Sequence, residues 1–261
     1  MGILNVTPDS FFDGGRYTED AALLTQVEKM LHEGATLLDI GGASSRPGAA
    51  EVSEHEECQR VIPAIESIIR RFPDTLLSVD TWRANVAAEA IGAGAAIIND
   101  ISGGNMDAAM PQTVAKQMAP YVLMHMQGTP NTMQQNPQYE DVVTEVLDFF
   151  IQKVKALQQA GVREIILDPG FGFGKSVAHN YTLLRHLHVF RAVLDLPVLA
   201  GISRKSMICK PLKVNPADAL NGTTALHMVA LQQGVSILRA HDVREAMEVI
   251  QLYQLVAGAP A

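Results

Sequence analysis

Eight short apolar runs alternate with helix-like stretches along this chain, and that alternation limits the fold more than any other feature. Each run is apolar almost throughout, as expected for a strand that is buried on both faces of a parallel sheet. The runs span Gly2–Val6, Thr36–Ile40, Leu76–Asp80, Ala96–Asp100, Tyr121–His125, Glu164–Asp168, Val198–Ile202 and Ser236–Ala240. Strands that alternate with helices in this way predict an α/β fold with a parallel sheet.

The segments between the runs favour a closed barrel over an open sheet. Helical patterns cover Glu19–Glu33, Glu54–Phe72, Tyr139–Ala160 and Asp218–Gln233. Glycine, which readily ends a helix, follows several helical segments, at Gly34, Gly161 and Gly234. A doubly wound open sheet would show the same alternation, but eight units in 261 residues match the size of one (β/α)8 TIM barrel. We therefore expect residues 1–261 to form one catalytic TIM-barrel domain.

Composition and charge exclude several classes of protein. The formal net charge of −8 disfavours non-specific binding to nucleic acid or to an anionic membrane. The only cysteines, Cys58 and Cys209, lack the spacing of a zinc site or a disulfide framework, which favours a reducing cytoplasm. No apolar run approaches the roughly 20 residues of a membrane-spanning helix. We expect a soluble cytoplasmic enzyme with small-molecule substrates.

Polar residues stand at or just beyond the ends of most predicted strands. They are Asn5, Asp39, Asp80, Asn99, Asp100, His125, Asp168, Ser203 to Lys205, Arg239 and His241. A single polar residue there often caps a helix or forms a turn. The carboxyl ends of barrel strands meet at one mouth, however, so the whole set predicts an active site at that mouth.

The opening stretch MGILNVTPDSFFDGG, residues 1–15, resembles the first strand and loop of dihydropteroate synthases, a family of pterin-binding TIM barrels. The resemblance continues through residues 42–48 (GASSRPG), 78–80 (SVD), 98–104 (INDISGG), 123–130 (LMHMQGTP), 168–175 (DPGFGFGK), 201–206 (GISRKS) and 239–242 (RAHD). It covers almost the whole chain. It implies a transferase of folate biosynthesis that condenses 6-hydroxymethyl-7,8-dihydropterin pyrophosphate with p-aminobenzoate, and it implies a homodimer.

A pterin ring is flat and has a guanidine-like edge, so it requires a buried carboxylate together with amide and ammonium groups. Asp168, Asn99 and Lys205 supply these groups. The resemblance implies a larger pterin-binding set of Asp80, Asn99, Met124, Asp168, Phe173, Gly201 and Lys205.

The run FGFGK at 171–175 lacks the spacing of a phosphate-binding loop, and a tight turn is expected there. His125 is expected to support the mouth.

The resemblance also assigns the rest of the site. Asn5 would bind Mg²⁺, an ion that usually keeps few protein oxygens and several waters. Pyrophosphate would contact Asn5, Arg46, Arg239 and His241. The p-aminobenzoate pocket would contain Phe11, Ser45, Arg46, Pro47, Ser203 and Lys205, with Ser45 standing where the family often has threonine.

The implied catalytic residues are Asp80, Lys205 and Arg239. Pyrophosphate would leave first, and the negative charge of Asp80 would favour the pterin methylene cation that remains. Sulfonamides, which resemble p-aminobenzoate, should compete for its pocket. Two alternatives stay open from the sequence: a pterin-binding methyltransferase barrel, and a catalytically inactive pterin-binding protein.

Overall fold

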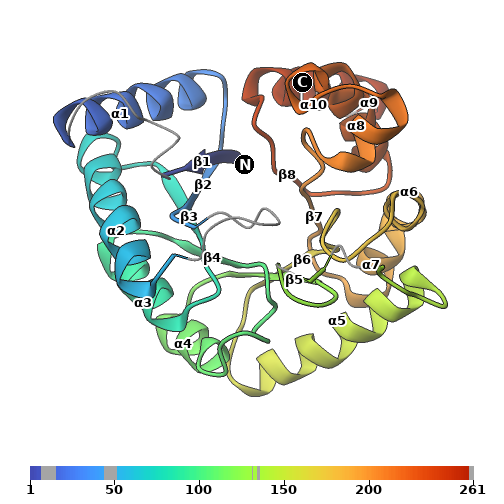
Figure 1. Cartoon of the computed structure of the whole chain (residues 1–261), viewed down its shortest axis with the longest axis horizontal. Helices are drawn as coiled ribbons and strands as arrows, with labels where there is room; N and C mark the ends of the chain where they lie inside the picture. The colour runs from blue at the N-terminus through green and yellow to red at the C-terminus, as the bar shows by residue number, and fades with distance from the viewer. Residues whose placement is uncertain (7–15, 44–51, 131, 134–135, 259–261) are drawn as a thin grey trace.

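The computed structural model of the chain describes residues 1–6, 16–43, 52–130, 132–133 and 136–258. Strands surround the centre of the molecule, and helices form a ring outside them (Figure 1). The strands are β1 (Gly2–Asn5), β2 (Leu37–Gly41), β3 (Leu76–Asp80), β4 (Ile97–Asp100), β5 (Tyr121–Met124), β6 (Ile165–Asp168), β7 (Leu199–Ala200) and β8 (Ile237–Leu238). All eight lie within the predicted runs or within one residue of them.

Hydrogen bonds close these strands into a barrel. Strands β1 to β6 form one sheet in chain order, and β7 pairs with β8. Leu167 at β6 forms a parallel bridge to Val198, next to β7. The other seam joins β8 to β1, where the Ile3 amide donates to the Ala240 carbonyl at 3.0 Å and the Ala240 amide donates to the Met1 carbonyl at 2.9 Å. The predicted (β/α)8 barrel is confirmed.

The last two strands are shorter than the sequence predicted. The runs Val198–Ile202 and Ser236–Ala240 shrink to two residues each in β7 and β8. The reason is that the backbone turns soon after β7: the Ile202 carbonyl accepts from the Lys205 amide at 3.2 Å, a turn contact in place of a strand contact. Turning early places the loop residues after β7 at the mouth of the barrel.

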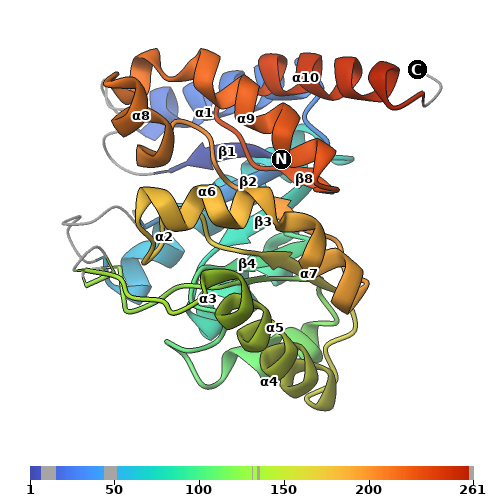
Figure 2. The same cartoon turned by 90° about the vertical axis from the view of Figure 1, so that its right-hand side faces the viewer.

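The helices follow the predicted order and agree with the predicted ranges to within three residues. They are α1 (Arg16–His32), α2 (Glu54–Arg71), α3 (Ala84–Ala93), α4 (Met110–Gln117), α5 (Val142–Gln159), α6 (Val177–Arg185), α7 (Leu187–Leu194), α8 (Ser206–Leu212), α9 (Leu220–Gln232) and α10 (Val243–Val256), with a short 3-10 turn at Pro216–Asp218. Figure 2 shows α6 and α7 following one another along the outside of the barrel. None of the helices in the described part of the chain is long and apolar enough to cross a membrane.

Residues that start and stop the helices have the expected chemistry. Ser53 precedes α2 and its hydroxyl accepts from the Glu56 amide, which satisfies a donor that the first turn of a helix leaves unpaired. Gly34, Gly161 and Gly234 have φ angles of 97°, 99° and 85°. Residues other than glycine rarely adopt such positive φ angles. The backbone geometry at the helix ends therefore explains why glycine follows the predicted helices.

Alternate residues of each strand face two different apolar layers. Side chains such as Leu38, Ile98 and Leu167 pack in the main core between strands and helices. Side chains on the other face of the strands form a second cluster. It consists of Ile97, Val122, Ile166 and Leu199, with Met1, Leu37 and Ile237 packed against them. Because side chains alternate along a strand, the second cluster fills the centre of the barrel near the start of the strands.

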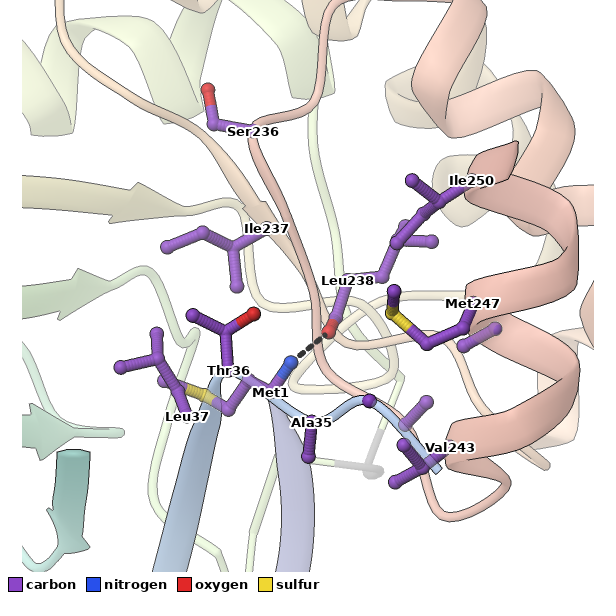
Figure 3. A pocket seen from close by; sticks show the side chains of 13 residues that line it. Met1, Ala35, Thr36, Leu37, Ser236, Ile237, Leu238, Val243, Met247 and Ile250 are labelled. Carbon is purple, nitrogen blue, oxygen red and sulfur yellow. Dashed lines mark hydrogen bonds between the residues drawn. The ribbon is translucent and has the colours of Figure 1, made fainter. Parts of the chain in front are cut away.

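A cavity of about 200 Å³ opens near the starts of the strands, at the end of the barrel away from the predicted mouth. Figure 3 shows its lining of mostly apolar side chains, among them Leu37, Met247 and Ile250. At its edge the Met1 nitrogen donates to the Leu238 carbonyl at 2.9 Å. A lining without catalytic side chains does not suit an active site, and active sites of this fold lie at the other end.

Candidate active site

The inward-facing strand positions become polar close to the carboxyl ends of the strands. Two residues beyond the apolar layer, the same face of six strands carries Asp39, Asn99, Met124, Asp168, Gly201 and Arg239. On the remaining strands, Asn5 and Asp80 both stand beside Gly41 in the register of β1, β2 and β3. The strand alternation therefore brings most of the predicted polar set to one mouth. Asp100 is the exception, because it follows Asn99 on β4 and so has the opposite parity, and its buried carboxylate accepts from the amides of Ser102 and Gly104 and from the Tyr121 hydroxyl.

Arg239 lies at the centre of a hydrogen-bonded network that joins four strands. Its Nε donates to Asp39 Oδ2 at 2.6 Å, and its Nη2 donates to Asp80 Oδ2 at 2.8 Å. The same Asp39 oxygen accepts from Asn99 Nδ2 at 2.9 Å. Nη1 of Arg239 has no hydrogen bond to any described residue, so one face of the guanidinium is available to a ligand.

The network contains two carboxyl groups, Asp39 and Asp80, and one guanidinium group, that of Arg239. Burial raises the pKa of Asp80 to about 7, the Arg239 guanidinium opposes this rise, and the neighbouring Asp39 carboxylate adds to it. The Asp80 side chain nevertheless keeps 18% of its surface exposed at the mouth. An accessible carboxyl group that ionises near neutral pH can respond to a positive charge that forms beside it.

Asp168 and Lys205 form the opposite side of the mouth. Asp168 is buried at the end of β6, and its Oδ1 accepts from the Gly170 amide at 2.8 Å. Burial raises the pKa of Asp168, whereas the ammonium of Lys205 opposes that rise. Burial also lowers the pKa of Lys205 to about 8, with Asp168 acting in the opposite direction. The pair supplies a carboxylate and an ammonium group in a partly dry site.

Lys205 is held against the loop that follows β6. Its Nζ donates to the Phe171 carbonyl at 2.6 Å and lies 4.8 Å from the centre of the Phe173 ring. Phe173 packs against a cluster that includes Met124, which is buried at the end of β5. A phenyl ring and a thioether beside the polar mouth form walls that suit a flat aromatic ligand.

A buried lysine fixes the tight turn after β6. Lys175 Nζ lies 2.9 Å from His125 Nδ1 and donates to the carbonyls of His125, Gly170 and Phe173 at 3.2, 3.1 and 3.0 Å. Burial, followed by the charge of Lys175, lowers the pKa of His125 to about 3, so the ring is neutral. His125 supports the mouth, as predicted, by holding this lysine.

Gly170 permits the close approach of this turn to β5. A Cβ atom at this position would lie 2.0 Å from the His125 carbonyl oxygen, and the φ angle is +68°. Any other residue would therefore displace the turn that carries Phe171 and Phe173. The predicted tight turn at 171–175 is present, but it also forms part of the wall of the site.

Two further predicted residues meet at the edge of the mouth. The buried Ser203 Oγ lies 3.0 Å from His241 Nδ1 and accepts from the His241 amide at 3.2 Å. Gly201 leaves room between Lys205 and Arg239, since a Cβ atom there would lie 3.7 Å from Lys205 Nζ and 4.0 Å from Arg239 Cβ. Ser203 and His241 therefore hold each other in place beside the mouth.

Comparison with known proteins assigns the family. The profile of the pterin binding enzyme family matches residues 1–241. Dihydropteroate synthase of Escherichia coli is 46% identical over 261 residues, which cover 99% of this chain and 92% of that protein. The chain belongs to the dihydropteroate synthase family.

Solved structures of the dihydropteroate synthase family have the same fold as this chain. The Yersinia pestis enzyme, crystallised as a sulfonamide drug complex, superposes with a TM-score of 0.92 at 46% identity, covering 99% of this chain and 94% of that one. The Xanthomonas albilineans enzyme in complex with 7,8-dihydropteroate gives 0.88 at 40% identity, covering 99% and 93%. The barrel and its catalytic class, a transferase, are those of dihydropteroate synthases.

Most of the predicted site residues lie in the described part of the chain and gather at one end of the barrel. The predicted pterin set, Asp80, Asn99, Met124, Asp168, Phe173, Gly201 and Lys205, lies around one mouth, with Asn5, Ser203, Arg239 and His241 at the same end. Phe11, Ser45, Arg46 and Pro47 fall outside the described residues, so their predicted contacts with p-aminobenzoate and pyrophosphate remain predictions.

The surroundings of Asn5 fit the magnesium ion expected for a dihydropteroate synthase. A Cβ atom on Gly41 would lie 3.8 Å from Asn5 Oδ1 and 3.8 Å from Asp80 Oδ2, so glycine keeps the space between these oxygens open. Among the described residues, no group of three or more histidine, cysteine, aspartate or glutamate side chains could hold a metal ion.

Sequence reasoning did not assign a function to Asp39 or Lys175. The sequence places Asp39 among the polar residues of the mouth without a role of its own, and it places Lys175 only at the end of a turn. The signal for Asp39 was available, since it shares the inward parity of β2 with Gly41. No comparable signal marked Lys175, because its partners on β5 and in its own loop meet only in the folded chain.

Proposed function

We propose that this chain joins 6-hydroxymethyl-7,8-dihydropterin pyrophosphate to p-aminobenzoate, giving 7,8-dihydropteroate and pyrophosphate. The observation that carries the proposal is the convergence of a buried carboxylate, an amide and an ammonium group beside a carboxylate pair that brackets an arginine. The carboxylate, the amide and the ammonium group suit the pterin ring. The two carboxylates with the arginine suit a reaction in which an anion departs and a cation forms.

For the pterin, Asp168 would accept from the amino-pyrimidine edge, since its Oδ2 accepts no hydrogen bond from the described residues. Asn99 and Lys205 would contact the polar atoms on the rest of the rim. Met124 and Phe173 would lie against the ring faces. Gly201 would leave space for the ring between Lys205 and Arg239.

In the reaction, the bond between the pterin methylene carbon and the pyrophosphate oxygen breaks first, and the electron pair leaves with pyrophosphate. The Asp80 carboxylate stabilises the positive charge that develops on the pterin, because it lies at the mouth and is only partly balanced by Arg239. The nitrogen lone pair of p-aminobenzoate then forms a bond to the methylene carbon, and the amine loses one proton to water. No covalent bond to the protein forms.

The leaving group would lie toward Arg239, His241 and Asn5, with Arg46 as a further predicted contact. Arg239 can donate from Nη1 while its other nitrogens hold Asp39 and Asp80. Asn5 would hold Mg²⁺, which supplies charge neutralisation for pyrophosphate. On the acceptor side, Ser203 and Lys205 would join Phe11, Ser45, Arg46 and Pro47 around p-aminobenzoate.

The decisive measurement is pyrophosphate release by the purified protein. We expect release only when the pterin pyrophosphate, p-aminobenzoate and Mg²⁺ are all present, with 7,8-dihydropteroate formed in equal amount. Methyl transfer from a methylated pterin, without pyrophosphate release, would instead support the methyltransferase alternative. Binding of a pterin without any turnover would support the inactive pterin-binding protein.

We further propose that residues 1–261 act as one catalytic domain, in the cytoplasm and as a homodimer. Eight strand–helix units that make one barrel support the single domain. The cytoplasmic proposal rests on the two cysteines, both of which are free thiols. The dimer rests on family membership alone, and sedimentation of the purified protein would test it.

Asp80→Asn should leave pterin binding nearly intact and lower turnover by about 10- to 100-fold, because the amide keeps the shape and removes the charge. The pKa of Asp80, raised to about 7 mainly by burial, predicts that turnover of the unmodified protein rises with pH around that value, as the group ionises. The variant should lose this rise. Rates measured between about pH 5.5 and 7.5 test both points. Loss of pterin affinity with turnover preserved would contradict the catalytic role.

Sulfonamides should inhibit competitively with p-aminobenzoate, because both molecules place an aromatic amine para to an acidic group. The Yersinia pestis relative was crystallised as a sulfonamide drug complex. Initial rates at several concentrations of both compounds would test the competition. Inhibition that excess p-aminobenzoate does not relieve would show that the drug binds elsewhere. Sulfanilamide analogues without the amine serve as the control.

A further inference from the structure

Asp39 is buried beneath the mouth and lies out of reach of solvent. Its side chain has an exposed fraction of 0%, compared with 18% for Asp80 and 18% for Arg239. Asp39 Oδ2 nevertheless accepts two hydrogen bonds from side chains that line the mouth, one from Asn99 Nδ2 and one from Arg239 Nε. A single buried oxygen therefore joins two groups that the proposed function places on different parts of the substrate.

The contact with Asn99 decides which end of its amide faces the ligand. An amide has a donor end and an acceptor end of almost equal shape, so a neighbouring group must set its orientation. Asn99 Nδ2 donates to Asp39, and a carboxylate can only accept. The Oδ1 atom of Asn99, which accepts no hydrogen bond from the described residues, is thereby left as an acceptor for the donor groups of a pterin.

The contact with Arg239 fixes the plane of its guanidinium. Asp39 holds Nε and Asp80 holds Nη2, at 2.6 and 2.8 Å. Two hydrogen bonds on one edge leave Nη1 as the nitrogen directed away from both carboxylates. Without Asp39, the guanidinium could rotate to make both hydrogen bonds to Asp80, which would neutralise the carboxylate proposed to stabilise the cation.

We propose that Asp39 is a positioning residue that sets the acceptor end of Asn99 and the plane of Arg239 together. The inference rests on the proposed function, because it assigns pterin binding to Asn99 and the pyrophosphate side to Arg239. Asp39 itself touches no substrate. It acts through two other side chains. Along β2 it lies two residues before Gly41, which pairs with Asn5 and Asp80.

Double-mutant cycles test the proposal, with 6-hydroxymethyl-7,8-dihydropterin as the calorimetric probe. Asp39→Ala should weaken dihydropterin binding about tenfold or more, because Asn99 is free to turn its donor end toward the ligand. In an Asn99→Ala background, the same change should have an effect of less than about twofold. Equal losses in both backgrounds, or no loss in either, would overturn the role assigned to Asp39.

The Arg239 side has its own readout. Asp39→Ala should lower kcat for the complete reaction, and the fall should be much smaller in an Arg239→Met background. Asp39→Asn keeps an acceptor oxygen that can face both donors, so it should restore dihydropterin affinity to within about threefold of the unmodified protein. An Asp39→Asn protein that folds but binds as weakly as Asp39→Ala, or additive effects on kcat, would contradict the proposal.

Glu57→Gln is the matched control, because Glu57 is also a fully buried carboxylate that pairs with an arginine, Arg83. It should lower the thermal unfolding midpoint while leaving dihydropterin affinity within about twofold. A comparable loss of affinity in this control would show that any buried ion pair has the same effect, and would overturn the specific role. Absence of binding by the unmodified protein would instead overturn the proposed function, and the inference with it.

Discussion

Replacing Asp168 by alanine is expected to weaken pterin binding by roughly 2 to 5 kcal/mol, or about 30-fold to several thousand-fold. The donor edge of the ring would lose a charged acceptor in a site where water cannot replace it, since Asp168 is only 6% exposed. The change would also release the Gly170 amide that Asp168 Oδ1 holds. Calorimetry with a dihydropterin measures the loss directly.

Two further variants separate charge from fold in this prediction. Asp168→Asn keeps an oxygen for the Gly170 amide but removes the charge, so its affinity should also fall strongly. Asp242→Ala removes a carboxylate that pairs with Arg204 instead of lining the mouth, and it should leave pterin affinity nearly unchanged. Unchanged affinity in Asp168→Ala would show that another group recognises the pterin edge.

Arg239→Met is expected to lower both turnover and stability, with a loss of about 3 to 5 kcal/mol in the free energy of unfolding near neutral pH. The reason is that the guanidinium is the common partner of Asp39, which is fully buried, and Asp80. Removing one partner of a buried ion pair leaves charge without compensation. Denaturant unfolding of the variant and the unmodified protein gives the difference.

The stability loss should depend on pH in a defined direction. Burial already raises the pKa of folded Asp80 above its ordinary value of 3.8, and removal of the opposing guanidinium raises that pKa further. A carboxyl group with a raised pKa in the folded state favours folding while it is protonated and opposes folding once it ionises. The free energy of unfolding of the variant should therefore be closest to that of the unmodified protein at about pH 5. At about pH 8 it should be much lower than that of the unmodified protein.

Arg204→Met provides the comparison for this pH effect. Arg204 also holds a carboxylate with two hydrogen bonds, to Asp242 at 2.8 and 2.7 Å, but the two side chains are 27% and 15% exposed. Solvent screens such a pair, so the stability loss should be smaller. A loss in Arg239→Met that is no larger than in Arg204→Met, or that is the same at both pH values, would refute the proposed burial of charge.

The sequence predicted the barrel because the responsible features are local. The run Leu76–Asp80 is a strand with the predicted bounds, and Gly161 ends a helix at a φ angle of 99°. Strand parity and glycine conformations follow from a few neighbouring residues. The same local rule placed Asp168 and Arg239 at the carboxyl ends of β6 and β8, and so at one mouth.

Contacts between distant segments decided what the sequence left open. Asp39 and Arg239 are 200 residues apart in the sequence. The sequence around either residue does not indicate that Arg239 donates to Asp39, or that Asn99 donates to the same carboxylate. Lys175 is likewise defined by His125, which is 50 residues away.

The sequence by itself thus determined the fold, the family and the end of the barrel where polar groups gather, because hydrophobic periodicity and strand order are written along the chain. Only the tertiary structure decided which of those groups bind ligand and which hold other groups in place. The physical reason is that burial and hydrogen-bond partners exist only after the eight strands close. They set the orientation of Asp39 and the charges of Asp80 and Lys175.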